Sequence, residues 1–242
     1  MFSQQKSKQI FICFIGIDGS GKTTLATNLM ALLRNEKVQT KYVWGAHNYV
    51  LLRPLTLLLK KHSRKSETTT PRNVNQTQRY GIARRIIKNP FMAKLYKVSV
   101  LSEYLLQILV KVRLPLIFGK NLICDRYVYD TAINLSVHLQ YSQENFKILL
   151  NRLLGPCPKP SVLFFVDLPE EIAFKRKNDI PSTDYLIQRR KLYRLLAKEY
   201  AVTRLDGSES LSKLKLLMLN TVFKTYECDP DTYSISNKRI PM

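Results

Sequence analysis

The chain has 242 residues, of which 39 are Lys or Arg and 18 are Asp or Glu, so its net charge is +21. Its content of 45% hydrophobic residues and only 8 glycines excludes a collagen, a coiled coil and a wholly disordered protein. The cationic excess predicts a polyanionic or phosphate-rich partner, which could be a nucleotide, a nucleic acid or an anionic membrane surface.

Strands and helices are predicted to alternate along the chain. Short apolar runs rich in β-branched and aromatic residues predict buried parallel strands at 10–15, 41–44, 121–124 and 162–166, with a weaker run at 201–205. Such alternation predicts an open α/β sheet layered by helices. The apolar stripes that predict the helices are Leu25, Leu29, Leu32 and Leu33 in the first, Phe91, Leu95, Val98, Leu105, Leu109 and Val112 in a long one, and Leu211, Leu214, Met218 and Val222 in the last.

Two segments are predicted to lie outside the packed core. Residues 62–78 hold almost no apolar side chains, which predicts a mobile polar loop. Residues 226–242 show no hydrophobic period, which predicts a poorly ordered tail.

The cysteines and the N-terminus indicate the compartment. Cys13, Cys124, Cys157 and Cys228 show no CxxC spacing, so we expect reduced core thiols, not a disulfide or zinc framework. The first residues lack the hydrophobic region of a signal peptide, and no run of about 18 apolar residues is free of charge. We therefore expect a cytoplasmic protein.

A phosphate-binding loop is predicted at residues 16–23, where GIDGSGKT fits the pattern GxxxxGK[ST]. The loop stands between a predicted strand and a predicted helix, so its backbone amides and the helix N-terminus can hold the phosphates of ATP. Lys22 is expected to reach the β- and γ-phosphates, and Thr23 to bind Mg²⁺. The predicted ATP-binding residues are Gly16, Asp18, Gly19, Ser20, Gly21, Lys22, Thr23 and Thr24.

The segment after the third predicted strand distinguishes classes of P-loop protein. Helicases and transporter ATPases place two acidic residues there, whereas this chain has Asp125 followed by Arg126. One acid followed by a cation is suited to Mg²⁺ beside an anionic acceptor. A GTPase is disfavoured because the only Asn-Lys pair, at 237–238, lies in the tail and lacks the following acid.

Four segments together resemble the thymidylate kinase family: GIDGSGKTT near the start, ICDRY at 123–127, PSVLFFVD at 160–167, and Arg176. The resemblance covers most of residues 8–223. It implies a three-layer α/β/α P-loop NTPase fold with a five-stranded parallel sheet and a short helical lid at 175–184. It also implies ATP and Mg²⁺ as cofactors, a nucleoside monophosphate as acceptor with dTMP converted to dTDP, and commonly a homodimer.

The resemblance further implies roles around the transferred phosphoryl group. Asp125 would position Mg²⁺ together with Thr23. Arg126 would hold the acceptor phosphate, or alternatively form a structural salt bridge. The predicted catalytic residues are Lys22 and Arg126 with Arg176 and Arg189 from the lid region. Arg189 could alternatively cover apolar surface with its side chain, and Arg190 is expected to be a solvated surface charge.

The acceptor itself is predicted to contact Asp18, Arg126, Tyr127 and Tyr104. Asp18 would contact the sugar, or alternatively cap the first helix or brace the loop. Tyr127 would stack on a base, or alternatively pack in the core.

The acceptor half of the chain departs from the family. The arginine of the thymidylate-reading helix is absent between Phe91 and Arg113, where Glu103, Tyr104 and Gln107 stand instead. A cation expected soon after the second strand is also absent, which leaves His47 or Arg53 as substitutes.

Two alternatives therefore stay open. One is a P-loop kinase that acts on another phosphorylated or hydroxylated small molecule. The other is an ATPase associated with nucleic acid or membrane, which the net charge and the basic residues between 72 and 88 motivate but which we do not favour because no nucleic-acid motif accompanies them.

Overall fold

The computed structural model describes residues 9–47 and 90–227. Five strands form one parallel sheet in the order β2-β3-β1-β4-β5. Each strand begins and ends within two residues of its predicted run, so the predicted α/β fold with a five-stranded parallel sheet is confirmed. The strands are β1 (Phe11–Ile15), β2 (Thr40–Trp44), β3 (Asn121–Asp125), β4 (Val162–Asp167) and β5 (Thr203–Asp206).

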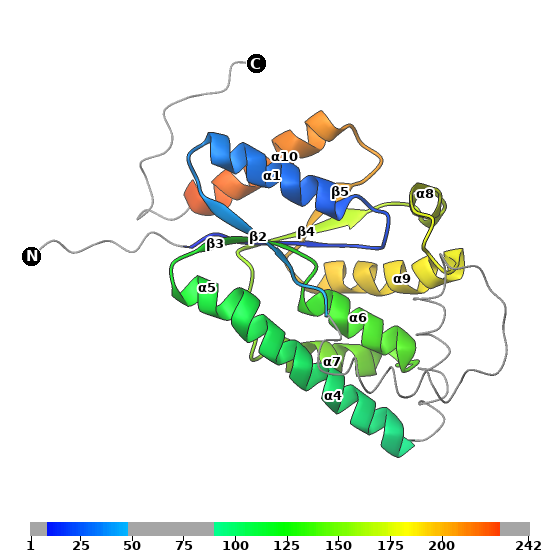
Figure 1. The fold of residues 1–242 in the computed structure, drawn as a ribbon. Helices are drawn as coiled ribbons and strands as arrows, with labels where there is room; N and C mark the ends of the chain where they lie inside the picture. The colour runs from blue at the N-terminus through cyan, green and yellow to red at the C-terminus, as the bar shows by residue number, and fades with distance from the viewer. Residues whose placement is uncertain (1–8, 48–89, 228–242) are drawn as a thin grey trace, which may run out of the picture.

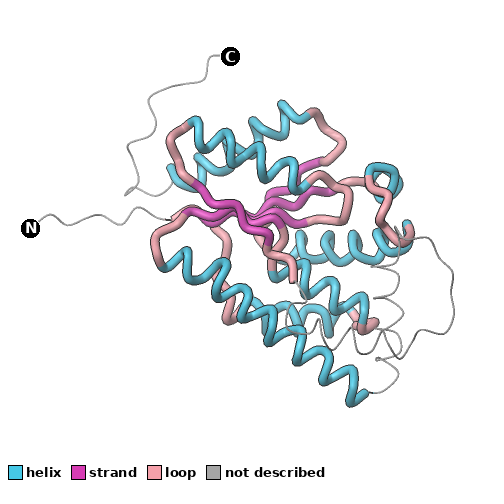
Figure 2. The backbone as a smooth tube through the Cα atoms, viewed as in Figure 1, coloured by secondary structure: helices cyan, strands magenta, loops and turns pink. Residues whose placement is uncertain are grey.

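Helices cover both faces of the sheet and make a three-layer structure (Figures 1 and 2). One face carries α1 (Lys22–Asn35) and α10 (Leu211–Glu227). The short α8 (Glu170–Arg176) lies beyond the carboxyl end of β4. The other face carries α4 (Pro90–Ile108), the π-helical turn η1 (Leu109–Arg113), α5 (Leu114–Ile117), α6 (Val128–His138), α7 (Gln143–Leu154) and α9 (Thr183–Glu199).

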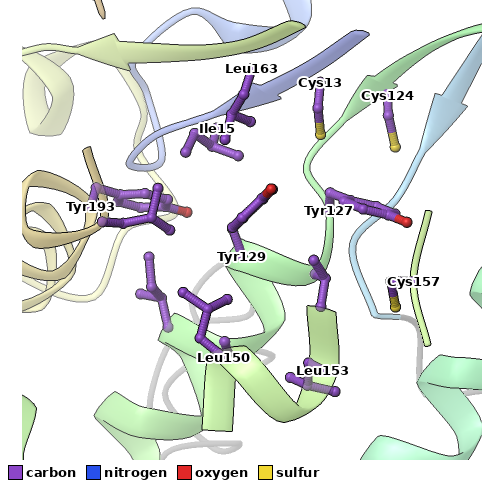
Figure 3. Packing of buried hydrophobic residues seen from close by; sticks show 14 of the residues in the cluster. Cys13, Ile15, Cys124, Tyr127, Tyr129, Leu150, Leu153, Cys157, Leu163 and Tyr193 are labelled. Atoms are coloured by element: carbon purple, nitrogen blue, oxygen red, sulfur yellow. The ribbon is translucent and has the colours of Figure 1, made fainter. Parts of the chain in front are cut away.

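The central strands separate two apolar clusters. Every residue of β1 and β4 is buried, because helices cover both sides of these strands. Figure 3 shows the cluster that lies between the sheet and the helices α6, α7 and α9. Its three thiols, Cys13, Cys124 and Cys157, are free and buried, which confirms that these cysteines are core residues without disulfides. Burial raises the pKa of the Cys13 thiol.

The predicted apolar stripe of the long helix is wrong. Phe91, Leu95, Val98 and Leu109 are exposed, and of the predicted stripe Val112 alone is fully buried. The apolar residues of α4 lie on all sides of the helix, so their spacing does not identify which face packs against the core. No helix in the described part of the chain is long and apolar enough to cross a membrane. The face of α4 and η1 that packs inward consists of Val100, Glu103, Tyr104, Ile108 and Val112.

Several sequence-based predictions fall outside the described residues. These are the polar loop at 62–78, the basic residues between 72 and 88, Arg53, and the tail from residue 228 onward. The first two residues of the predicted tail, 226 and 227, belong to α10.

Candidate functional site

The phosphate-binding loop connects β1 to α1. Gly19 has a φ of +81°, and a Cβ atom there would lie 2.4 Å from the carbonyl oxygen of Ala173, so the loop requires glycine at this position. Lys22 begins α1 and folds back into the loop, where its Nζ donates to the Ile17 carbonyl at 2.5 Å and contacts Ser20 Oγ at 3.3 Å. Burial, followed by the nearby charge of Arg126, lowers the pKa of Lys22 to about 8.

A cleft of about 500 Å³ opens beside this loop. Residues that follow β4 and β5 form its far wall, namely Arg176, Lys177, Gly207 and Leu214. The cleft therefore brings together eight of the predicted ATP-binding and catalytic residues with the predicted lid arginine. They are Asp18, Gly19, Ser20, Gly21, Lys22, Thr23, Thr24 and Arg126, joined by Arg176.

Oxygen atoms suited to Mg²⁺ meet where β1 and β3 end. The hydroxyl of Thr23 donates to Asp125 Oδ2 at 2.5 Å, and the Tyr42 hydroxyl donates to the same oxygen at 2.9 Å. The other carboxylate oxygen, Asp125 Oδ1, is buried and accepts no hydrogen bond from the described residues. A hard cation such as Mg²⁺ takes oxygen ligands and usually binds through one or two carboxylates plus phosphates, so Thr23 and Asp125 fit it.

Within residues 9–47 and 90–227, no group of three or more His, Cys, Asp or Glu side chains could hold a metal ion. Sequence reasoning missed Tyr42, because nothing local to β2 indicates that this strand pairs with β3 and reaches Asp125.

Arg126 is the centre of a charged cluster beside the loop. Its backbone has a left-handed φ of +68°, and its amide donates to the carbonyl of Phe14 at 2.9 Å. The guanidinium forms ion pairs with Asp18 and, at 2.8 Å, with Asp130. Burial opposes ionisation of the Asp18 carboxyl group, but the charge of Arg126 holds the pKa of Asp18 well below its usual value. Asp18 thus braces the loop against Arg126, and no side chain caps α1.

Helix α9, which follows the predicted lid, contacts this cluster through two tyrosines to which the sequence analysis assigned no role in the site. Tyr193 donates to Asp130 at 2.5 Å, and Tyr185 donates to Asp18 at 3.3 Å. The guanidinium of Arg189 stacks 3.9 Å from the centre of the Tyr185 ring and donates to Asn134. Arg189 is buried and does not line the cleft, whereas the other predicted catalytic residues do.

The prediction for Arg190 is wrong. Arg190 is only 8% exposed and donates to Asp167 at 2.7 Å and to Glu170 at 2.5 Å. Asp167 is buried at the end of β4, and a buried carboxylate is stable only when cations pair with it. Arg204 at 2.6 Å and Arg194 at 3.3 Å are its further partners. These pairs link α9 to β4 and α8, and they link β5 to β4.

Two predicted acceptor residues, Tyr104 and Tyr127, lie in the core. Tyr127 donates to the carbonyl of Pro158 at 2.9 Å, and Tyr104 donates to the carbonyl of Gly45 at 3.1 Å. Both side chains are fully buried, and neither lines the cleft. For Tyr127 the structure matches the alternative of a packed core tyrosine.

Comparison with known proteins agrees with this geometry. The chain is similar to a thymidylate kinase. That enzyme, from Ligilactobacillus salivarius (strain UCC118), is 25% identical over 222 residues, which cover 84% of this chain and 92% of the relative. No protein-family model matches the chain. A distant similarity over most of both chains, together with the P-loop fold, supports a nucleotide-kinase-like protein.

Proposed function

We propose that the protein transfers the γ-phosphoryl group of ATP to a nucleoside monophosphate, with dTMP as the acceptor. The observation that carries this proposal is the position of Arg126, which lies against the phosphate-binding loop and lines the same cleft as Lys22. A cation at this point suits a second phosphate, whereas hydrolysis needs a group that activates water. The similarity to a thymidylate kinase supports dTMP as the acceptor.

The donor nucleotide would occupy the cleft beside the loop. The loop amides and Lys22 would hold its phosphates, and the apolar side chains of Leu211 and Leu214 suit the face of a base. Thr23 and Asp125 would hold Mg²⁺, which when bound neutralises charge on the β- and γ-phosphate oxygens.

The chemical step needs positioning more than proton transfer, because the acceptor phosphate oxygen is already anionic near neutral pH. That oxygen forms a bond to the γ-phosphorus while the bond from this phosphorus to the bridging oxygen of ADP breaks. Lys22, Arg126 and Arg176 line the cleft and would stabilise the charge of the migrating group. Arg189 would act by positioning Tyr185 and, through it, Asp18. A homodimer stays a prediction.

An assay of ADP release tests the proposal directly. With ATP and Mg²⁺, dTMP is expected to stimulate ADP release to a turnover of about 1–100 s⁻¹, the usual range of kinases. The control is ATP without acceptor, and the panel contains the other common nucleoside monophosphates. If no nucleotide stimulates release while ATP still binds, nucleotide phosphorylation is ruled out. Stimulation by another monophosphate alone overturns the choice of dTMP and keeps the kinase.

Binding of ATP is expected to weaken as the pH rises above about 8. Lys22 has a pKa of about 8 in the free protein, so the cationic form that attracts phosphate is lost above this pH. A single such group predicts a Kd that rises by up to about tenfold for each further pH unit. Calorimetry near pH 8.5 should detect proton uptake on binding. The variant Lys22→Met should bind ATP weakly, with a Kd that does not depend on pH in this range. If the Kd of the unmodified protein is equally independent of pH, the charge of Lys22 is not what attracts the phosphates.

A further inference from the structure

Helices α4, η1 and α5 form one continuous rod at the outer edge of the helical layer (Figure 1). The residues at the two junctions, Ile108 and Leu114, have right-handed helical dihedral angles, so the chain does not turn between these helices. A helix rises 1.5 Å per residue, which makes the rod about 40 Å long. One long side of the rod therefore faces away from the sheet.

This outer side of the rod is apolar. The inner side packs into the core through Val100, Tyr104, Ile108 and Val112, which are spaced four residues apart. Among the described side chains, no other helix or strand exposes more than three large apolar residues. A surface helix normally presents polar residues to solvent, so an apolar outer side indicates a partner. The exposed residues, here called the outer stripe, are Leu95, Val98, Leu106, Leu109, Val110, Leu114, Ile117 and Phe118.

The exposed charges along the rod are all positive. Residues 90–120 contain five Lys or Arg and one acidic residue, Glu103, which is buried on the inner side. Lys94 near the start of the rod and Lys120 just after its end are exposed, and Lys111 between them is half-buried. A surface with an apolar stripe and only cationic charges is complementary to a partner that is both apolar and anionic.

An anionic bilayer fits this surface better than other partners do. A second copy of the chain would place the outer side against itself, since a two-fold interface is isologous, and the lysines of the two copies would repel each other. A nucleic acid would attract the lysines but leave the leucines in water. An interfacial helix lies in the plane of a membrane, with its apolar face at the acyl chains and its cations at the headgroups.

We propose that the rod formed by α4, η1 and α5 docks the protein on the surface of an anionic lipid bilayer. The outer stripe enters the boundary between headgroups and acyl chains, while Lys94 and Lys120 contact the anionic headgroups. Other elements line the cleft beside the phosphate-binding loop, so this surface is separate from the proposed ATP site. The inference goes beyond the proposed function and does not depend on it.

Cosedimentation of the full chain with lipid vesicles tests this inference. Vesicles of phosphatidylcholine with about 30% phosphatidylglycerol should bind the protein at least tenfold more tightly than vesicles of phosphatidylcholine alone. The double variant Leu106→Gln, Leu109→Gln should bind the anionic vesicles about tenfold more weakly or worse, because two leucines no longer enter the acyl region. The matched control is Leu216→Gln, Leu217→Gln on α10. These leucines are 52% and 41% exposed, against 52% and 40% for Leu106 and Leu109.

Three results would overturn the inference. The first is that the unmodified protein does not bind the anionic vesicles. The second is that Leu106→Gln, Leu109→Gln binds them as tightly as the control variant does, since the lysines alone would then account for binding. The third is a dimer in sedimentation velocity that this variant dissociates, because the outer stripe would then join two copies of the chain.

A charge variant keeps the test decisive if the leucine variant does not fold, which its melting temperature would reveal. Lys94→Gln, Lys120→Gln leaves the outer stripe intact and removes two exposed cations. Its binding to the anionic vesicles should be about tenfold weaker, and should fall less when salt is added, than that of the unmodified protein. Unchanged binding by this variant overturns the inference. Kinase activity enters none of these measurements, so failure of the proposed function leaves the result readable.

Discussion

Replacing Lys22 with methionine is expected to lower kcat/KM for phosphoryl transfer by about 10³-fold or more, because a preorganised positive charge on the phosphates is lost. The free energy of unfolding is expected to stay equal or to increase. Folding moves the pKa of Lys22 from 10.5 to about 8, so the folded structure opposes the charge of this side chain by about 3 kcal/mol. Below pH 8 this cost is fully present, and it disappears as the pH rises through 10.5.

Acceptor-dependent ADP release and urea unfolding at pH 7 together check this prediction. A variant that loses activity and stability in parallel would show that Lys22 supports the fold, which contradicts the role assigned to it. Thr27→Ala is the control, since Thr27 is an exposed residue of α1 whose hydroxyl donates to the backbone carbonyls of Thr23 and Thr24 in its own helix.

Replacing Arg126 with leucine is expected to impair both transfer and stability. Transfer should fall by about 10³-fold, by analogy with other arginines that hold a migrating phosphoryl group. The free energy of unfolding should fall by about 3–5 kcal/mol, because Asp18 and Asp130 would remain buried without their shared cation. Arg126 is therefore expected to differ from Lys22, whose loss should lower activity without lowering the free energy of unfolding.

A second substitution separates the two effects. Asp130→Asn removes one of the buried carboxylates, so the double variant Arg126→Leu, Asp130→Asn should regain part of the lost stability and none of the lost activity. Thermal melts and ADP-release kinetics of the four proteins in this cycle supply the comparison. Recovery of activity in the double variant would show that Arg126 serves only to neutralise Asp130.

The sequence predicted those features that depend on local pattern. Continuous apolar runs identified all five strands, and the spacing of glycines and Lys22 identified the loop. The cluster around Arg126 could not be predicted, because its members Asp130, Tyr185 and Tyr193 come together only when α6 and α9 pack on the same face of the sheet. Arg190 was misjudged for the same reason. On a helix rich in charged residues, nothing local distinguishes an arginine that turns toward a buried carboxylate from one in solvent.

The three buried thiols of the core allow local opening of the structure to be measured by chemical labelling. Cys13 lies in β1, Cys124 beside it in β3, and Cys157 after α7, all closed to solvent. A thiol reagent can modify them only when the surrounding structure opens, so the labelling rate at each site measures the free energy of that opening. Equal rates at all three sites would mean that sheet and helices separate together. Faster labelling of Cys157 would mean that the helical layer detaches while the sheet remains intact.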